Sequence, residues 1–223
     1  DKNLRYIGGD PNNYVRFNDE LWRVIGIMNN VPDSTGTKAS HIKLIRADSL
    51  GRIAWNSNGN NDWSSATLQT LLNSGDYWSR TGDYSSTGLT SDAKRMISNI
   101  TWNLGGRGNT DATAKTFYTA ERSTTVPSGR PTTWTGYVGL MYLSDYGYAV
   151  GGSVRSTCLS KQLYNYSTAN CHTNDWIYLG DRTQWTLSPT SDSFGYVFSI
   201  GSNGFLYFDH ASGTYAVRPV VYL

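Results

Sequence analysis

The C-terminal stretch of the chain, residues 185–223, decides the fold: it reads WTLSPTSDSFGYVFSIGSNGFLYFDHASGTYAVRPVVYL. Its two ends are apolar and frame a middle rich in Ser, Asp, Tyr and Phe. Within that middle, residues 197–200 and 205–208 flank Gly201-Ser-Asn-Gly204, which predicts a β-hairpin. We interpret the stretch as a rigid frame that displays aromatic and short polar side chains, the mixture that adaptable recognition surfaces use. An ordinary edge hairpin of a β-rich domain is the alternative.

Length and composition indicate one globular domain. The 223 residues contain no recognisable linker, so we expect a single domain over residues 1–223. Aromatic residues make up 13 % of the chain, enough large rings for a sizeable core. The net charge of +2 comes from dispersed Lys and Arg, which indicates no nucleic-acid partner. No apolar run is long enough for membrane insertion.

Composition and cysteine use both point to export. Only 16 % of the residues are charged, and Ser, Thr, Asn, Gly and Tyr are abundant, as is typical of extracellular proteins. Cys158 and Cys171 are the only cysteines, and a disulfide between them would stabilise the fold by about 3 kcal/mol. We predict this disulfide and not a catalytic pair of Cys171 with His172, because adjacent residues rarely aim both side chains at one substrate. We therefore expect a secreted or cell-surface protein, with any export signal or anchor outside this sequence.

The remaining elements predict an α+β order. Residues 14–17 and 21–27 predict a hairpin, and residues 41–46 predict a third strand. In the second strand of the hairpin, alternation places Leu21, Arg23, Ile25 and Ile27 on one face and Trp22, Val24 and Gly26 on the other. The second half of the chain predicts short aromatic strands and long loops, with N- and C-terminal strands able to pair.

Two helices are predicted between these parts. The first is capped by Ser64 or Ser65 and carries Leu68, Leu71 and Leu72. The second is capped by Thr90 or Ser91 and ends at Gly105-Gly106. Its apolar stripe is predicted to face the core and consists of Ala93, Met96, Ile97, Ile100 and Leu104. Asn61-Asp-Trp63 and Asn174-Asp-Trp176 echo each other, and we interpret them as two Asx-turns that each seat a Trp.

Motifs over nearly the whole chain resemble a family of uncharacterised surface domains from gut-dwelling Gram-positive bacteria, some with pilin-like leaders. These motifs are residues 13–26 (NYVRFNDELWRVIG), 42–46 (IKLIR), 61–63 (NDW), 134–136 (WTG), 139–142 (GLMY), 144–148 (SDYGY), 185–189 (WTLSP) and 217–219 (VRP). The resemblance implies a surface location and supplies no function.

A more distant resemblance concerns the fold. A Trp-containing strand, a variable-looking polar stretch and an Arg-containing terminal strand resemble the C-type-lectin-like fold. That fold includes formylglycine-generating enzymes and the variable proteins diversified by retroelements. The resemblance implies that ligand-facing residues lie between the Trp strand and the terminal strand. Those positions are Ser191, Asp192, Phe194, Tyr196, Asn203, Tyr207, Asp209, His210, Ser212 and Tyr215.

Departures from these relatives argue against an enzyme, a metal and a cofactor. The sugar-binding tripeptides of calcium-dependent lectins are absent, and no cysteine follows Cys171, whereas formylglycine-generating enzymes use a C-terminal pair. Asn58, Asn60 and Asp62 resemble a calcium loop but lack its bidentate Glu, so we interpret them as a structural turn. The three His, at 41, 172 and 210, show no metal-ligand spacing. No nucleophile elbow, phosphate loop or zinc-protease motif occurs.

The leading hypothesis is therefore a non-enzymatic, exported adhesion domain that binds an unknown protein or glycan on a host or microbial surface. The alternative is a structural pilin-head or surface-layer module that assembles with copies of itself. A third hypothesis, an enzyme acting on surface polysaccharide, would require a cleft lined by two carboxyl groups with raised pKa.

Overall fold

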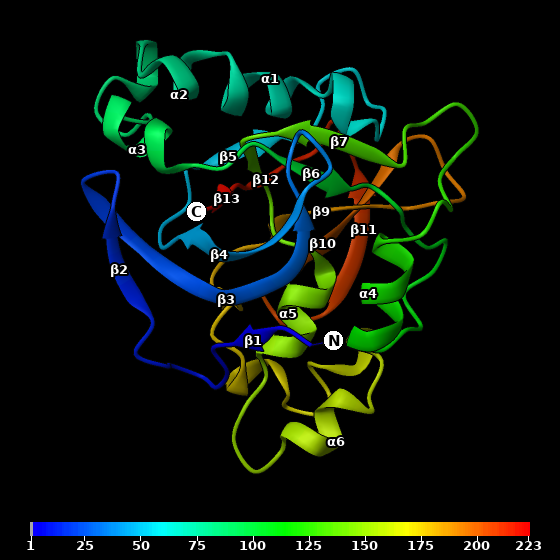
Figure 1. Ribbon diagram of the computed structural model, residues 1–223. Coiled ribbons are helices and arrows are strands. Elements are labelled where there is room, and N and C mark those ends of the chain that lie inside the picture. Colours follow the sequence, from blue (N-terminus) through cyan, green and yellow to red (C-terminus); the bar gives the residue numbers. More distant parts are fainter. Residues whose placement is uncertain (1) are drawn as a thin grey trace.

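Three β-sheets, mostly antiparallel, form the centre of the protein (Figure 1). The structure is a computed structural model that describes residues 2–223, so Asp1 of the predicted domain lies outside the described residues. The six-stranded sheet has the order β1-β3-β4-β13-β8, with β2 paired to β3. Its strands are β1 (Leu4–Arg5), β2 (Tyr14–Phe17), β3 (Glu20–Pro32), β4 (Lys38–Arg46), β8 (Val138–Gly139) and β13 (Val220–Tyr222).

The five-stranded sheet carries the C-terminal hairpin and has the order β11-β10-β9-β12-β5. Its strands are β5 (Arg52–Ala54), β9 (Gln184–Pro189), β10 (Tyr196–Ile200), β11 (Leu206–His210) and β12 (Thr214–Ala216). Strand β11 forms one edge of this sheet. The third sheet pairs β6 (Ile100–Asn103) with β7 (Thr133–Gly136).

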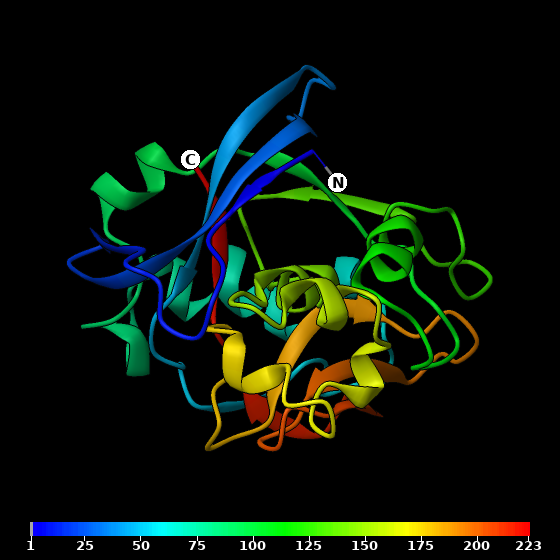
Figure 2. The same cartoon turned by 90° about the horizontal axis from the view of Figure 1, so that it is seen from below.

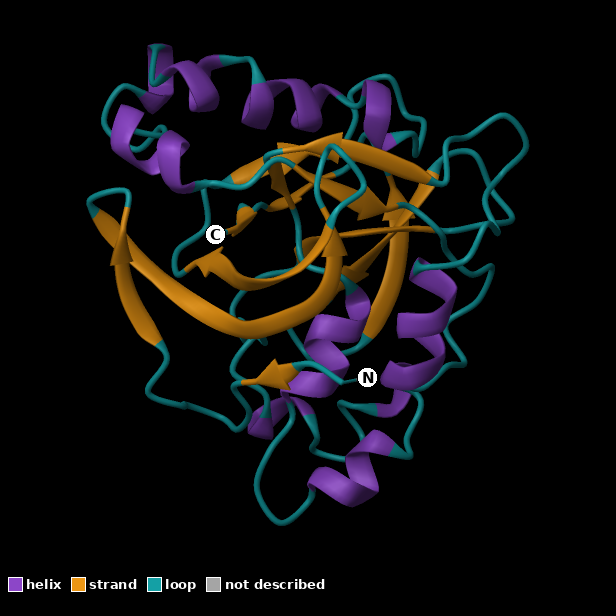
Figure 3. Cartoon of the chain, in the orientation of Figure 1, coloured by secondary structure: helices purple, strands orange, loops and turns teal. Residues whose placement is uncertain are grey.

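Helices cover the sheets from two sides (Figure 3). Figure 1 shows α1, α2 and α3 together above the strands, whereas α4, α5 and α6 lie on the lower side. The helices are α1 (Thr67–Asn73), α2 (Asp76–Ser79), α3 (Ser91–Met96), α4 (Ala114–Glu121), α5 (Leu143–Ala149) and α6 (Arg155–Leu159). Short 3-10 turns are η1 (Trp63–Ser65), η2 (Gly82–Tyr84), η3 (Leu163–Asn165) and η4 (His172–Asn174). The protein is thus α+β, as predicted.

The predicted N-terminal hairpin is present, but one face assignment within it is wrong. Strands β2 and β3 pair across a turn at Asn18 and Asp19, whose φ angles of 56° and 60° suit a tight hairpin turn. The register between β3 and β4 shifts between Val24 and Gly26. A bulge of this kind adds one residue and breaks the two-residue period, so Ile25 is buried with Trp22 while Ile27 is exposed.

Both predicted helices exist, but their limits differ from the prediction. The first is α1, and Ser64 and Ser65 belong to the preceding η1, where the Asp62 side chain accepts a hydrogen bond from Ser64 N. The second is α3, and Thr90 caps it by accepting a hydrogen bond from Ala93 N, as expected. It stops at Met96, which is largely exposed, because the following residues join the small sheet as β6. Of the predicted stripe, Ala93 and Met96 therefore lie in α3 and Ile100 lies in β6, whereas Ile97 and Leu104 lie outside both elements.

The sequence predicted two helices and missed α4 and α5, because neither segment carries a clear helical pattern. Every residue of α5 is buried, so its sequence shows no polar face and no amphipathic period. This helix contains the whole motif at residues 144–148 (SDYGY). In α4, Thr113 supplies the N-cap, and Phe117 packs edge-on against Phe198 of β10.

One contiguous cluster of buried apolar side chains runs from Phe17 to Tyr222. The N- and C-terminal strands pair as predicted: β13 pairs with β4 and lies between β4 and β8 in the six-stranded sheet, while β1 pairs with β3. Figure 2 shows the long β3–β4 hairpin extending beyond the body of the molecule, beside the N-terminus.

A buried ionic cluster connects the six-stranded sheet to α5. The Asp145 carboxylate lies 2.5 Å from Lys43 Nζ and 2.7 Å from Arg5 Nη1, and it also accepts a hydrogen bond from Tyr142 N. The Lys43 ammonium lies 4.5 Å from the centre of the Tyr142 ring. Burial lowers the pKa of Lys43 to about 8, against the attraction of Asp145. Burial alone raises the pKa of Asp145, but Lys43 and Arg5 outweigh it and hold that pKa far below its usual range.

The predicted disulfide is present between Cys158 and Cys171, with Cα atoms 5.7 Å apart. It closes the lobe that contains η3 and part of α6. The two echoing motifs are also confirmed as Asx-turns. Asp62 Oδ1 accepts a hydrogen bond from Ser64 N, Asp175 Oδ1 accepts one from Ile177 N, and Trp63 and Trp176 are buried.

Candidate functional site

The predicted ligand-binding residues divide into three groups. Two groups lie on opposite faces of the C-terminal hairpin, and the third, Ser191 and Asp192, lies in the loop before β10. Residues directly opposite each other in a strand pair lie on the same face. Tyr196 is opposite His210 and Phe198 is opposite Phe208, whereas Ser199 is opposite Tyr207. The first two pairs share the face that packs on α4, and Tyr207 lies on the other face. The prediction treated these residues as one surface, and the pairing separates them.

The first group, the Tyr207 cluster, consists of Asn203, Tyr207, Asp209 and Tyr215. Together with Thr183 and Ser202, these residues line an open depression of about 290 Å³. Asn203 Nδ2 donates to the Tyr207 hydroxyl at 3.0 Å, and the Tyr215 hydroxyl donates to Asp209 Oδ1 at 2.9 Å. Ser199 Oγ donates to the other Asp209 oxygen at 2.5 Å. Burial and the nearby Asp209 raise the pKa of Tyr215. The polar groups of this cluster thus largely satisfy one another.

The second group, the aromatic cluster, consists of Tyr196, of Phe208 and His210, whose rings contact the Tyr196 ring, and of Phe194, two residues before Tyr196 in the chain. The Tyr196 ring meets Phe208 and His210 edge-on, with centroid distances of 5.7 and 5.6 Å. Phe194 is 55 % exposed and Phe208 is 48 % exposed, large values for phenylalanine in a folded domain. His210 Nδ1 lies 2.8 Å from Ser212 Oγ, which places the predicted Ser212 at the polar edge of the cluster.

A network around Asn61 holds the loop that carries the aromatic cluster. The buried Asn61 Nδ2 donates to the backbone carbonyls of Thr190, Ser193 and Tyr196, and Asn61 N donates to the carbonyl of Phe194. One side chain therefore fixes the whole bend before β10. Exposed aromatic rings on a fixed backbone lose little entropy when a partner covers them.

The predicted calcium-like positions serve this same turn. Asn60 Oδ1 accepts hydrogen bonds from Asn56 Nδ2 and Asp62 N, and Asp62 lies 3.6 Å from Arg130. Arg130 in turn lies 5.3 Å above the Phe194 ring. Within residues 2–223, no three His, Cys, Asp or Glu side chains gather in a way that could hold a metal ion.

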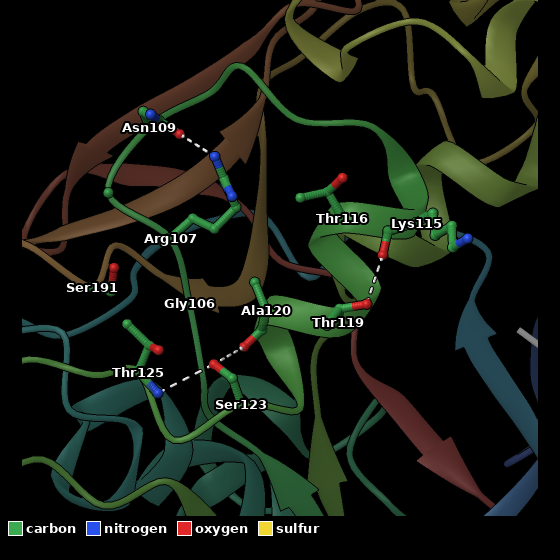
Figure 4. A pocket seen from close by; sticks show the side chains of 11 residues that line it. Gly106, Arg107, Asn109, Lys115, Thr116, Thr119, Ala120, Ser123, Thr125 and Ser191 are labelled. Atoms are coloured by element: carbon green, nitrogen blue, oxygen red, sulfur yellow. Dashed lines mark hydrogen bonds between the residues drawn. The ribbon is translucent and has the colours of Figure 1, made fainter.

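The third group consists of Ser191 and Asp192, and the Asp192 carboxylate lies against Gly108 in the segment before α4. Ser191 borders an open depression of about 770 Å³ beside α4, across from Lys115, Thr116 and Thr119 (Figure 4). Ser191 N donates to the carbonyl of Arg107. These two residues therefore belong to the contact between the loop before β10 and the segment before α4.

Sequence reasoning missed two residues of the aromatic cluster region. Phe208 lies within the quoted hairpin, and its alternation with Tyr207 already placed it on the opposite face. Arg130 comes from a loop more than sixty residues earlier in the chain, and no local pattern marks it. Only the folded chain brings it to Phe194.

Carboxyl groups with raised pKa are enclosed in the core. Burial raises the pKa of Glu121 and that of Asp175, and both residues are almost fully inaccessible. Glu121 accepts hydrogen bonds from Ser144 and Ser188, and Asp175 accepts one from Ile177 N. Among exposed acids, Asp181 pairs with its neighbour Arg182, which lowers the pKa of Asp181.

Comparisons with protein-family models, with curated proteins and with solved structures found no match for this chain. None of the helices within residues 2–223 combines the length and the apolar character needed to cross a membrane. The function is therefore inferred from the geometry of the chain itself.

Proposed function

We propose that this protein is a non-enzymatic, exported recognition domain that binds a protein on a host or microbial surface through the aromatic cluster. The observation that carries the proposal is the exposure of Phe194, Tyr196 and Phe208 on a backbone fixed by Asn61. Exposed aromatic side chains with an adjacent Arg are the composition of protein-binding hot spots. Ser212 and His210 supply a polar rim.

The aromatic cluster suits a partner better than the Tyr207 cluster does. Hydroxyl and carboxylate groups of the Tyr207 cluster already bond to each other, so a ligand would have to break these bonds or share them. The rings of the aromatic cluster have apolar surface that only water now covers, and covering it is favourable by about 25 cal/mol per Å². Among the two ligand classes left open by the sequence, a protein therefore fits better than a glycan.

A C-type-lectin-like frame is part of the proposal. Two features support it: the N- and C-terminal strands share one sheet, and the display hairpin lies between the Trp185 strand β9 and the terminal strand β13. In the retroelement-diversified proteins that the chain resembles, the variable ligand-facing residues occupy that interval. Membership of the gut bacterial surface-domain family, and the secreted or cell-surface location that it implies, belong to the same proposal.

The ligand class is tested by flow cytometry with the fluorescently labelled domain on intact human intestinal epithelial cells and on intact gut bacteria. We expect saturable binding to one cell type that is lost after mild protease treatment of the cells and kept after periodate oxidation of their glycans. Binding that survives protease and disappears with periodate would contradict a protein ligand. Absence of saturable binding to either cell type would contradict the recognition function.

A second candidate function, self-assembly as a pilin-head or surface-layer module, is favoured by a separate apolar stripe. Leu4, Ile27 and Ile42 lie side by side across β1, β3 and β4, and each is at least 40 % exposed. An exposed stripe on a different sheet from the aromatic cluster offers a second contact surface, as head-to-tail assembly requires. Sedimentation velocity over a wide concentration range tests it. Self-assembly predicts association that Ile27→Lys abolishes, and a monomer at every concentration contradicts it.

A further inference from the structure

A cavity of about 310 Å³, which we call the Arg122 cavity, lies beside the turn end of the β3–β4 hairpin. The hairpin contributes Asn30 and Lys38, β6 contributes Asn103, and α4 contributes Tyr118 and Arg122. Tyr222 of β13 forms part of its inner wall. None of these residues belongs to the aromatic cluster or to the Tyr207 cluster.

The Arg122 cavity is electropositive. Lys38 and Arg122 line it, and no Asp or Glu does so among residues 2–223. Behind its wall, Lys43 lies 5.2 Å from the Tyr222 ring centre, and Arg5 lies beside the same carboxylate as Lys43. Lys43 and Arg5 share one carboxylate, that of Asp145, and Arg122 pairs with the buried Glu121, whose pKa burial raises. An anionic ligand would meet a favourable potential there.

Protein contacts hold the Arg122 guanidinium in place and leave some of its N–H donors available to a ligand. It stacks 3.5 Å from the Tyr118 ring centre, and the two hydrogen bonds it makes to the protein, to Tyr118 O and to Glu121 Oε2, both use Nη1. The side chain is 29 % exposed. Nε and Nη2 therefore remain for a ligand, and a guanidinium fork matches a carboxylate in two parallel hydrogen bonds.

The uncharged polar and aromatic side chains around Arg122 suit a ring that carries hydroxyl groups, such as a sugar. The Tyr222 hydroxyl and the Asn103 carboxamide make no side-chain hydrogen bond to another described residue, and both residues line the cavity. Asn30 has a φ of 58° within a register shift between Met28 and Val31, so the hairpin is locally bent beside the cavity. Tyrosine rings stack on the apolar faces of sugar rings, and amides and hydroxyls bond to sugar hydroxyls.

We propose that the Arg122 cavity binds a carboxylate-bearing sugar residue, a uronic or sialic acid, with the carboxylate on Arg122 and the ring hydroxyls on Asn103 and Tyr222. The volume is at the low end of small-molecule sites, which fits one or two sugar rings. This site does not depend on the proposed protein-binding function, because it uses different elements and a different ligand class.

The test is isothermal titration calorimetry of the whole domain with defined probes. The acidic probes are 3′-sialyllactose and tetragalacturonic acid, and their neutral counterparts are lactose and the fully methyl-esterified tetragalacturonate. We expect at least one acidic probe to bind at least tenfold more tightly than its neutral counterpart, and this preference to weaken with added salt. The two acidic probes distinguish sialic acid from uronic acid as the natural source.

Three variants locate the binding. Arg122→Gln should weaken binding about ten- to hundredfold, since it removes charge-assisted hydrogen bonds. Lys38→Gln, at an exposed residue with no ion pair among the described residues, should weaken binding about two- to fivefold without disturbing the fold. Lys161→Gln removes the same charge from an exposed residue that does not line the cavity, and it should leave binding unchanged.

Several results would overturn the proposal: equal affinity for acidic and neutral probes, no binding of either acidic probe at millimolar concentration, or an equal loss in Lys161→Gln and Lys38→Gln. If Arg122→Gln fails to fold, judged by circular dichroism, the Lys38→Gln and Lys161→Gln pair decides alone. Loss of cell binding through the aromatic cluster leaves this titration unaffected, so the two proposals fail separately.

Discussion

Replacing Asp145 with Asn should be one of the most damaging isosteric changes in this protein. Asp145 is 2 % exposed in its side chain, and its two oxygens contact Arg5 Nη1 at 2.7 Å and Lys43 Nζ at 2.5 Å. Asn keeps the shape but removes the charge, and its amide group turns donors either towards Arg5 or towards Lys43 and Tyr142 N, which share one oxygen of Asp145. Removing one partner of a buried ion pair costs about 3–5 kcal/mol, because the other charge stays buried and loses its counter-charge.

Lys43→Met should cost less than Asp145→Asn. Methionine fills a similar volume among the rings of Trp102, Tyr142 and Tyr222, and Asp145 keeps Arg5 as a counter-charge. The substitution removes the buried ammonium of Lys43 and with it the free-energy cost of its desolvation. We therefore expect the free energy of unfolding to fall by about 2 kcal/mol or less. The order of the two variants therefore separates electrostatics from packing.

Urea unfolding followed by tryptophan fluorescence measures both changes. Asp92→Asn is the matched control, since Asp92 pairs with Arg95 on the surface and both side chains are more than two-thirds exposed. The control should lose less than about 1 kcal/mol. A loss below about 1 kcal/mol in Asp145→Asn, or a larger loss in Lys43→Met than in Asp145→Asn, would refute the electrostatic reasoning.

Three further predictions concern stability. Reduction of the Cys158–Cys171 disulfide should lower the free energy of unfolding by about 3 kcal/mol, and intact-mass measurement after alkylation of the unreduced, denatured protein should find no free thiol. Asn61→Ala should cost about 2–3 kcal/mol, because the carbonyls of Thr190 and Ser193 lose the Asn61 donor and that of Tyr196 keeps only its bonds from Thr190, and hydrogen exchange should accelerate in residues 190–196 while the N-terminal hairpin is unchanged. The folded pKa of Asp145 lies below its unfolded value of about 3.9, so its stabilisation is present above pH ~4 and is lost as the pH falls further. Urea midpoints at pH 5 and pH 3 should therefore differ more in the wild type than in Asp145→Asn.

Strong local signals made several parts of the fold predictable. The run Gly201-Ser-Asn-Gly204 between two apolar segments specified the hairpin β10–β11, and Thr90 specified the start of α3. The sequence could not reveal the bulge at Ile25, because a bulge depends on how β3 and β4 pair. It also concealed α5, whose residues are buried on all sides.

The candidate site was predictable as a stretch of chain but not as a surface. Exposure of residues such as Tyr196 and Tyr207 followed from their setting among Ser, Asp and Gly. Their separation onto two faces followed from the strand register, which the length of the turn sets and the composition does not. Arg130 reaches Phe194 only through the tertiary fold, so the sequence carries no local signal for it.

The most direct test of the recognition surface compares two neighbouring residues of β11 in the cell-binding assay. Tyr207 and Phe208 are 43 % and 48 % exposed and point to opposite faces of the sheet, so each substitution controls for the other. We predict that Phe208→Ala weakens binding at least tenfold, as expected for a hot-spot residue, and that Tyr207→Ala leaves it within about twofold. Full binding by Phe208→Ala together with loss in Tyr207→Ala, both variants being folded, would contradict the assignment of the site to the aromatic cluster.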